Sequence, residues 1–219
     1  MPQLEENSKP DEVENDWITN FFDKCRLISD DEMQRLWSRV LAGEANSPGT
    51  YSKRTVNFLS DLDKSDAELF TRLCGFGWAV REVVPLIYDE QTEIYNKQGI
   101  NFVTLIHLES IGLIQFQQLG FKFLKLPKRL GVMYYGVPVV LELPKDSDNS
   151  LDVGKVLLTK IGKELAPISG SKPVEGFFDF VFEKLKSQGY IIDPKAKSDD
   201  KTPSPPSSAV VTAEEEQNK

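Results

Sequence analysis

The chain has 219 residues, of which 40% are hydrophobic and 10% aromatic, so it can bury a core as one domain or two small ones. It contains no run of about 18 apolar residues, and its first residues lack a basic region followed by an apolar one, so we predict neither a membrane span nor a secretory signal. The formal net charge of −8 lies mainly in the first 16 residues, and the nearly neutral remainder neither implies nor excludes contact with nucleic acid.

The two ends of the sequence have the composition of disordered segments. Residues 1–12 are acidic and nearly free of large apolar side chains, and residues 194–219 are dominated by Lys, Ser, Asp and Pro. We therefore predict a disordered acidic N-terminus over 1–12 and a disordered tail over 194–219. Cys25 and Cys74 are the only cysteines, and both fall in apolar helical patterns, which indicates buried, reduced thiols in a cytoplasmic protein.

Residues 13–78 carry the pattern of four short helices joined by short loops, which predicts an antiparallel helical bundle. The first helix has Trp17, Phe21 and Phe22 on one side. The second has an apolar stripe at helical spacing and is predicted to end at Gly43. Side chains that can cap a helix precede the last three helices. They are Ser29, in a capping box with Glu32, then Ser52 and Asp63.

Residues 79–193 mix strands and helices. A helix over 101–111, with Leu105, Ile106, Leu108 and Ile111 inward, leads into a strand over 113–117 whose predicted hairpin partner is 121–126. A further β-rich stretch over 134–143 contains Pro138, which indicates an edge. Additional elements are expected at 83–88, 155–158, 159–166 and 174–186. This order predicts an α+β fold whose second half, 79–193, is winged-helix-like.

A longer motif within 29–74 allows a family comparison. It contains a tryptophan helix, a Pro-Gly turn, a Ser-x-Arg-Thr helix start and a final helix. These parts are Trp37 with Leu41-Ala42-Gly43-Glu44, Pro48-Gly49, Ser52-Lys53-Arg54-Thr55 and Asp66-Ala67-Glu68-Leu69-Phe70. The segment resembles the bacterial domain-of-unknown-function family 2806, and in pattern the helical core of abortive-infection proteins of the alpha type. The resemblance implies a bacterial cytosolic protein and a link to defence against phage.

Residues with catalytic or metal-binding chemistry are sparse. His107 is the only histidine and lies within an apolar helix, where a structural imidazole is commoner than a general base. The sequence has no zinc-ligand spacing, no phosphate-binding glycine loop and no calcium loop around Asp146, Asp148 and Asp152. We therefore predict no enzymatic activity, no cofactor and no metal.

Basic residues are the candidate contacts to an anion or to nucleic acid. Arg54 lies in the first turn of its helix, where a cation opposes the helix dipole, so it indicates either an ion pair with a residue such as Glu44 or an anionic ligand. Four more basic residues surround the predicted hairpin: Lys122, Lys125, Lys128 and Arg129. They indicate either phosphate contacts at a wing or an edge strand protected by lysines.

The leading interpretation is a non-enzymatic regulatory or interaction protein that binds a protein partner or itself through helical surfaces. The alternative is a winged-helix DNA-binding regulator. Against the alternative, the helix expected to enter the major groove contains neither Lys nor Arg.

Overall fold

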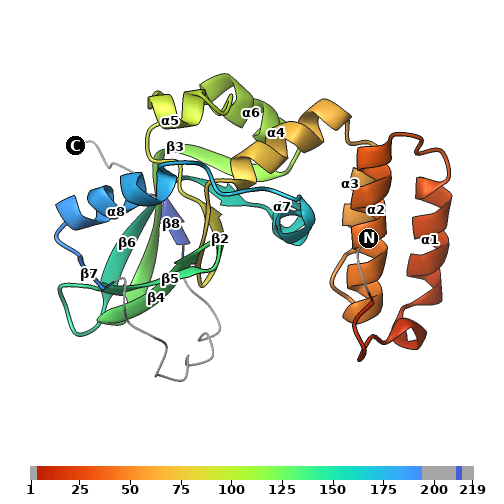
Figure 1. The fold of residues 1–219 in the computed structure, drawn as a ribbon, viewed down its shortest axis with the longest axis horizontal. Helices are drawn as coiled ribbons and strands as arrows, with labels where there is room; N and C mark the ends of the chain where they lie inside the picture. Colours follow the sequence, from red (N-terminus) through yellow and green to blue (C-terminus); the bar gives the residue numbers. More distant parts are fainter. Residues whose placement is uncertain (1–3, 194–210, 214–219) are drawn as a thin grey trace. The chain divides into compact units, whose positions relative to one another are not determined.

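The computed structural model describes residues 4–193 and 211–213. The chain forms two compact units, each built from two separate stretches of sequence (Figure 1). The first unit comprises Met1–Thr71 and Lys160–Ser171, and the second comprises Arg72–Thr159 and Lys172–Lys219. The first unit is helical and the second contains both sheets, so the protein has an α+β structure. The sequence-based boundary after residue 78 falls inside the first strand of the second unit.

The helices of the first unit begin and end close to their predicted positions. They are η1 (Pro10–Glu12), α1 (Asn15–Cys25), α2 (Asp31–Asn46), α3 (Lys53–Ser60), α7 (Lys160–Leu165) and η2 (Ala166–Ile168), while α4 (Lys64–Cys74) contains the division between the units. Residues 10–12 of the predicted disordered N-terminus thus form a helical turn, and the amide of Lys9 donates to the carbonyl of Ala45 at 2.7 Å.

Aromatic rings form the core between α1 and α2. Trp17 and Phe21 stack at 5.1 Å between centroids, and Phe21 meets Trp37 edge-on at 5.1 Å. All three side chains are buried, which agrees with the predicted stripes. Phe22 does not join this core, because its side chain is 54% exposed.

The ends of α2 differ from the prediction. Asp30, not Ser29, is the N-cap: its carboxylate accepts from the amides of Glu32 and Met33 at 3.0 and 3.1 Å. The helix also continues past Gly43 to Asn46. Gly43 does not end the helix but makes room for the Tyr51 ring. A Cβ at position 43 would lie 2.7 Å from Cε2 of Tyr51.

The second unit contains eight strands and three helices among its described residues. They are β1 (Gly77–Val80), β2 (Glu82–Pro85), α5 (Glu93–Asn96), α6 (Phe102–Ser110), β3 (Ile114–Leu126), β4 (Arg129–Tyr134), β5 (Val137–Glu142), β6 (Asn149–Leu158), α8 (Phe177–Ser187), β7 (Ile191–Asp193) and β8 (Val211–Ala213). The antiparallel strands form one sheet in the order β2-β1-β4-β5-β7 and another in the order β6-β3-β8.

The predicted hairpin over 113–117 and 121–126 is wrong. Both stretches belong to the single strand β3, whose antiparallel partner is β6. Gly120, with φ of +81°, lies within a register shift between Phe116 and Phe121, so it bends the strand without reversing it. The two-residue turn of a true hairpin lies elsewhere, at Tyr135 and Gly136 between β4 and β5, where φ is +44° and +84°.

Pro138 lies where β5 has only one neighbouring strand in the described part of the chain. It pairs with Met133 of β4, whereas β7 pairs only with residues 140–142 of β5. The missing amide of proline therefore costs no ladder hydrogen bond on that side.

Helix α8 covers one face of the five-stranded sheet through aromatic rings. Phe178 stacks on Trp78 of β1 at 5.6 Å, and Phe177 meets Tyr134 of β4 at 5.8 Å. The Tyr134 hydroxyl donates to the Gly75 carbonyl and accepts from the Val174 amide, both at 2.8 Å. This hydroxyl ties the sheet to the segments before β1 and before α8.

Within the predicted disordered tail, only residues 211–213 are described, and they form β8 on β3; residues 194–210 and 214–219 lie outside the described residues. Cys25 and Cys74 are both free thiols, Cys25 half-buried and Cys74 buried.

Candidate functional site

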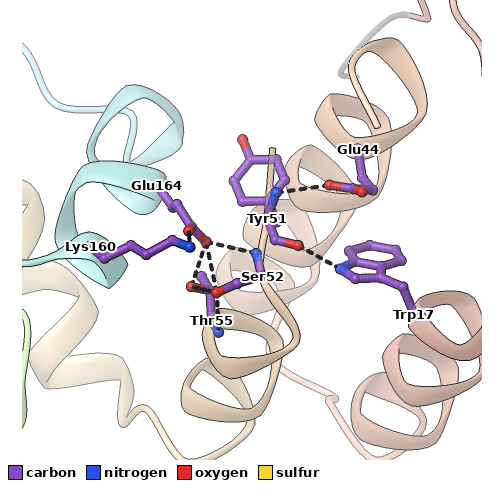
Figure 2. A network of polar contacts seen from close by, with 7 residues as sticks. All are labelled: Trp17, Glu44, Tyr51, Ser52, Thr55, Lys160 and Glu164. Carbon is purple, nitrogen blue, oxygen red and sulfur yellow. Dashed lines mark hydrogen bonds and ion pairs between the residues drawn. The ribbon is translucent and has the colours of Figure 1, made fainter. Parts of the chain in front are cut away.

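Residues of the motif within 29–74 take part in a polar network in the first unit (Figure 2). Two glutamates, Glu44 from α2 and Glu164 from α7, both bind the backbone of the turn that leads into α3. The network was not predicted, because Glu164 lies more than 100 residues after the turn in sequence and no local pattern marks it.

Glu44 is the acceptor for the amides of the Pro-Gly turn. Its two carboxylate oxygens accept from the amides of Gly49 at 2.6 Å and Tyr51 at 2.8 Å. The side chain is only 3% exposed, so both bonds form away from water. Glu44 was predicted as a partner for Arg54, and this prediction is wrong, because its carboxylate binds backbone amides instead.

Glu164 binds the first turn of α3. One carboxylate oxygen accepts from the Ser52 amide at 2.9 Å, the Ser52 hydroxyl at 3.2 Å and the Thr55 hydroxyl at 2.6 Å. The other oxygen lies 3.9 Å from Nζ of Lys160. The Ser52 hydroxyl also accepts from the Thr55 amide at 3.3 Å, which confirms Ser52 as the N-cap. A negative charge at this position also favours the helix dipole.

Tyr51 joins the two glutamates to α1. Its backbone carbonyl accepts from Nε1 of Trp17 at 2.7 Å, and its side chain is buried. Burial, and then the negative charges of Glu164 and Glu44, raise the pKa of the Tyr51 phenol above its ordinary value. Tyr51 therefore stays neutral inside the network.

The network has the chemistry of a structural site. Its carboxylates accept from backbone amides and hydroxyls, so they are not free to act as a general base. Throughout the described residues, no group of three or more His, Cys, Asp and Glu side chains is arranged to hold a metal ion.

Arg54 lies beside this network but does not take part in it. Its side chain is exposed on α3, and within the described part of the chain it forms no hydrogen bond or ion pair. Contact between Arg54 and an external anion stays a prediction.

The other basic candidates are spread over β3, the following turn and β4. Lys122 is half-buried in β3, and Lys125 is exposed with φ of +55°. Nζ of Lys128 binds the carboxylate of Asp146 at 3.0 Å, which raises the pKa of Lys128. Arg129 lies opposite Glu142 in the β4–β5 register. Lys122 likewise lies opposite Asp152 in the β3–β6 register, so three of the four positive charges have an acidic residue bound or directly opposite, which weakens a phosphate-binding patch.

Helix α6 presents a surface that was not predicted. Phe102, Val103 and Ile106 are 43%, 73% and 42% exposed, and we call these three residues the α6 apolar face. Ile106 was predicted to point inward with Leu105 and Leu108, but only the latter two are buried. The sequence carries a signal for this face, because α6 has more apolar residues than one buried stripe needs.

The chain belongs to the family described as proteins of unknown function (DUF2806), which matches residues 1–181. The match includes the first unit, with the Glu44 and Glu164 network, and the second unit as far as α8. Comparisons with curated proteins and with solved structures found no match. No helix in the described ranges is long and apolar enough to cross a membrane.

Proposed function

We propose that this protein is a non-enzymatic regulatory protein of the bacterial cytoplasm that acts by protein–protein contact, with the α6 apolar face as its contact surface. The observation that carries the proposal is the exposure of Phe102, Val103 and Ile106 on one short helix. Scattered exposed apolar residues are normal in proteins, but neighbouring ones on one helix mark an interaction surface.

The partner that best fits this face is a second copy of the chain. Helix α6 contains no Lys or Arg, and its one carboxylate, Glu109, accepts from the Phe116 amide of its own unit at 2.8 Å. Two copies of the face can therefore meet about a twofold axis without bringing like charges together. Burial of the three side chains would supply the driving force.

Sedimentation velocity over a concentration series tests this proposal. The wild-type chain is expected to form a dimer, and Val103→Asp is expected to be monomeric at the same concentrations. Leu27→Asp is the matched control, because Leu27 is 82% exposed in the first unit and its substitution should leave the dimer intact. A wild-type chain that stays monomeric throughout the series would refute self-association through α6.

The absence of enzymatic activity is part of the same proposal. It is supported by the carboxylates of the network, which bind backbone amides. Purified protein should show no hydrolysis of nucleotides, lipids or nucleic acids. An activity that disappeared on a single substitution would overturn this part of the proposal.

A role in defence against phage rests on the resemblance to abortive-infection proteins of the alpha type. Bacteria that express the chain are expected to show a lower plaquing efficiency for at least one phage than cells with an empty vector. Val103→Asp should restore plaquing, and Leu27→Asp should not. Equal plaquing in all strains across a broad phage panel would remove this role.

A winged-helix DNA-binding regulator is the second candidate. It is favoured by the helices α5 and α6, which lead into β3, and by the antiparallel pairing of β3 with β6. Gel-shift titration at two salt concentrations separates the candidates. DNA binding should weaken with salt and with charge reversal at Lys122, Lys125, Lys128 and Arg129. Absence of binding at low salt would eliminate it.

A further inference from the structure

The long strand β3 is paired very differently on its two sides. On one side β6 accompanies it from Ile114 to Leu126. On the other side only β8 pairs with it, at the positions Phe121↔Ala213, Lys122↔Thr212 and Phe123↔Val211. In the described part of the chain, the second edge of β3 is therefore covered only over residues 121–123, by a strand of three residues.

The segment that covers this edge is connected by a long stretch of sequence. Strand β7 ends at Asp193 and β8 begins at Val211, and residues 194–210 lie between them. When extended, such a stretch can span roughly 55 Å.

Two properties make β8 a displaceable occupant. A ladder of three positions supplies few backbone hydrogen bonds, so the strand is held weakly in itself. Because β8 belongs to the same chain as β3, its pairing is intramolecular, and a peptide from another molecule has to compete with it. The sequence at 210–213 is Val-Val-Thr-Ala, which has the β-branched residues favoured in strands.

We propose that the Phe121–Phe123 edge of β3 is a docking site for a short extended peptide rich in β-branched residues, and that β8 occupies it in cis as a tethered competitor. A peptide of this kind would add to the sheet through its backbone, as in β-augmentation. The exposed edge of a sheet is a template for pairing, so its occupation by β8 would also prevent unwanted association. This edge is separate from the α6 apolar face, and the inference does not depend on the proposed function.

Fluorescence anisotropy with the chain's own tail peptide, residues 208–215 carrying a dye, tests the proposal on the full-length protein. The variants are Val211→Pro and Thr212→Pro in the protein, since one of these two amides must face β3. At least one variant is expected to bind the peptide about fivefold more tightly than wild type, because the tethered competitor is lost. Ser207→Pro, outside β8, is the matched control and should bind as wild type does.

Hydrogen exchange gives a second readout. The amides of 121–123 that face β8 should exchange faster in the tighter-binding variant, and added peptide should slow them again. Equal affinity of wild type and both proline variants, or no binding to any of them, would overturn the proposal. Val103→Asp should bind the peptide as wild type does, so failure of α6 self-association and failure of this site remain distinguishable.

Discussion

At the scale of single residues, Glu44 connects the family motif to the fold. Its carboxylate accepts from two buried amides, at Gly49 and Tyr51. In Glu44→Gln, one carboxylate oxygen becomes an NH2 group that faces a backbone donor, so one amide loses its acceptor. We expect the free energy of unfolding to fall by about 1–3 kcal/mol, measured by urea denaturation.

Glu32→Gln is the control for this substitution. Glu32 pairs with Lys64 at 2.9 Å, but its side chain is 60% exposed, so the change should be within about 0.5 kcal/mol. Equal effects of the two substitutions would show that the buried amide bonds of Glu44 do not contribute more than a surface pair.

Tyr134 should make the stability of the second unit depend on pH in the alkaline range. Burial raises the pKa of Tyr134 from an ordinary 10.0 to about 12. Between these values the tyrosine ionises in the unfolded chain while it stays neutral in the folded one. Its contribution to stability is therefore complete below pH 10 and is lost as the pH rises towards 12.

Tyr134→Phe tests this dependence. At pH 8 the variant should be less stable than wild type by about 1–3 kcal/mol, because the Gly75 carbonyl and the Val174 amide lose their partner. The difference should narrow by pH 11, since phenylalanine does not ionise. Urea denaturation at pH 8, 9.5 and 11 measures the free energy of unfolding of wild type and variant. A difference between them that stays constant with pH would contradict the raised pKa of Tyr134.

At the scale of secondary structure, Gly154 determines how closely β6 approaches the segment after β2. Its φ is +84°, and a Cβ would lie 2.5 Å from the Ile87 carbonyl oxygen. Gly136, in the turn between β4 and β5, has the same φ of +84° but nothing within 4 Å. Gly136→Ala should cost about 1–2 kcal/mol from backbone strain alone. Gly154→Ala should cost at least about 2 kcal/mol more in urea denaturation, and equal costs would refute the steric argument.

Elements with a local sequence signal could be predicted, and those set by tertiary pairing could not. Helix α6 and the capping of α3 by Ser52 were predictable, because spacing and caps are local signals. The pairing of β3 with β6 was not, since two apolar stretches separated by Leu119 and Gly120 look the same as a hairpin. Only part of the polar network could be predicted. Gly43, Glu44 and Ser52 lie close together in the sequence motif, whereas Glu164 reaches them only through the tertiary fold.

At the scale of the whole molecule, the first unit is completed by α7 and η2 from residues 160–171. A fragment of residues 13–78, the boundaries that the sequence indicates, lacks Glu164 and the carbonyl of Ile168 that accepts from Arg39 at 2.7 Å. We expect the fragment to lose most of its helical circular dichroism and its cooperative melting. Cooperative melting at the temperature of the full-length protein would show that residues 160–171 are dispensable.

The alternation of the two units along the chain also has a consequence for synthesis. Because the polypeptide leaves the ribosome from its N-terminus, α1, α2 and α3 emerge before α7, which supplies Glu164, has been translated. The second unit in turn awaits α8, encoded after α7, to cover its sheet. The first unit therefore cannot be completed until most of the second has been translated, and the second unit cannot be completed until the whole of the first has been translated.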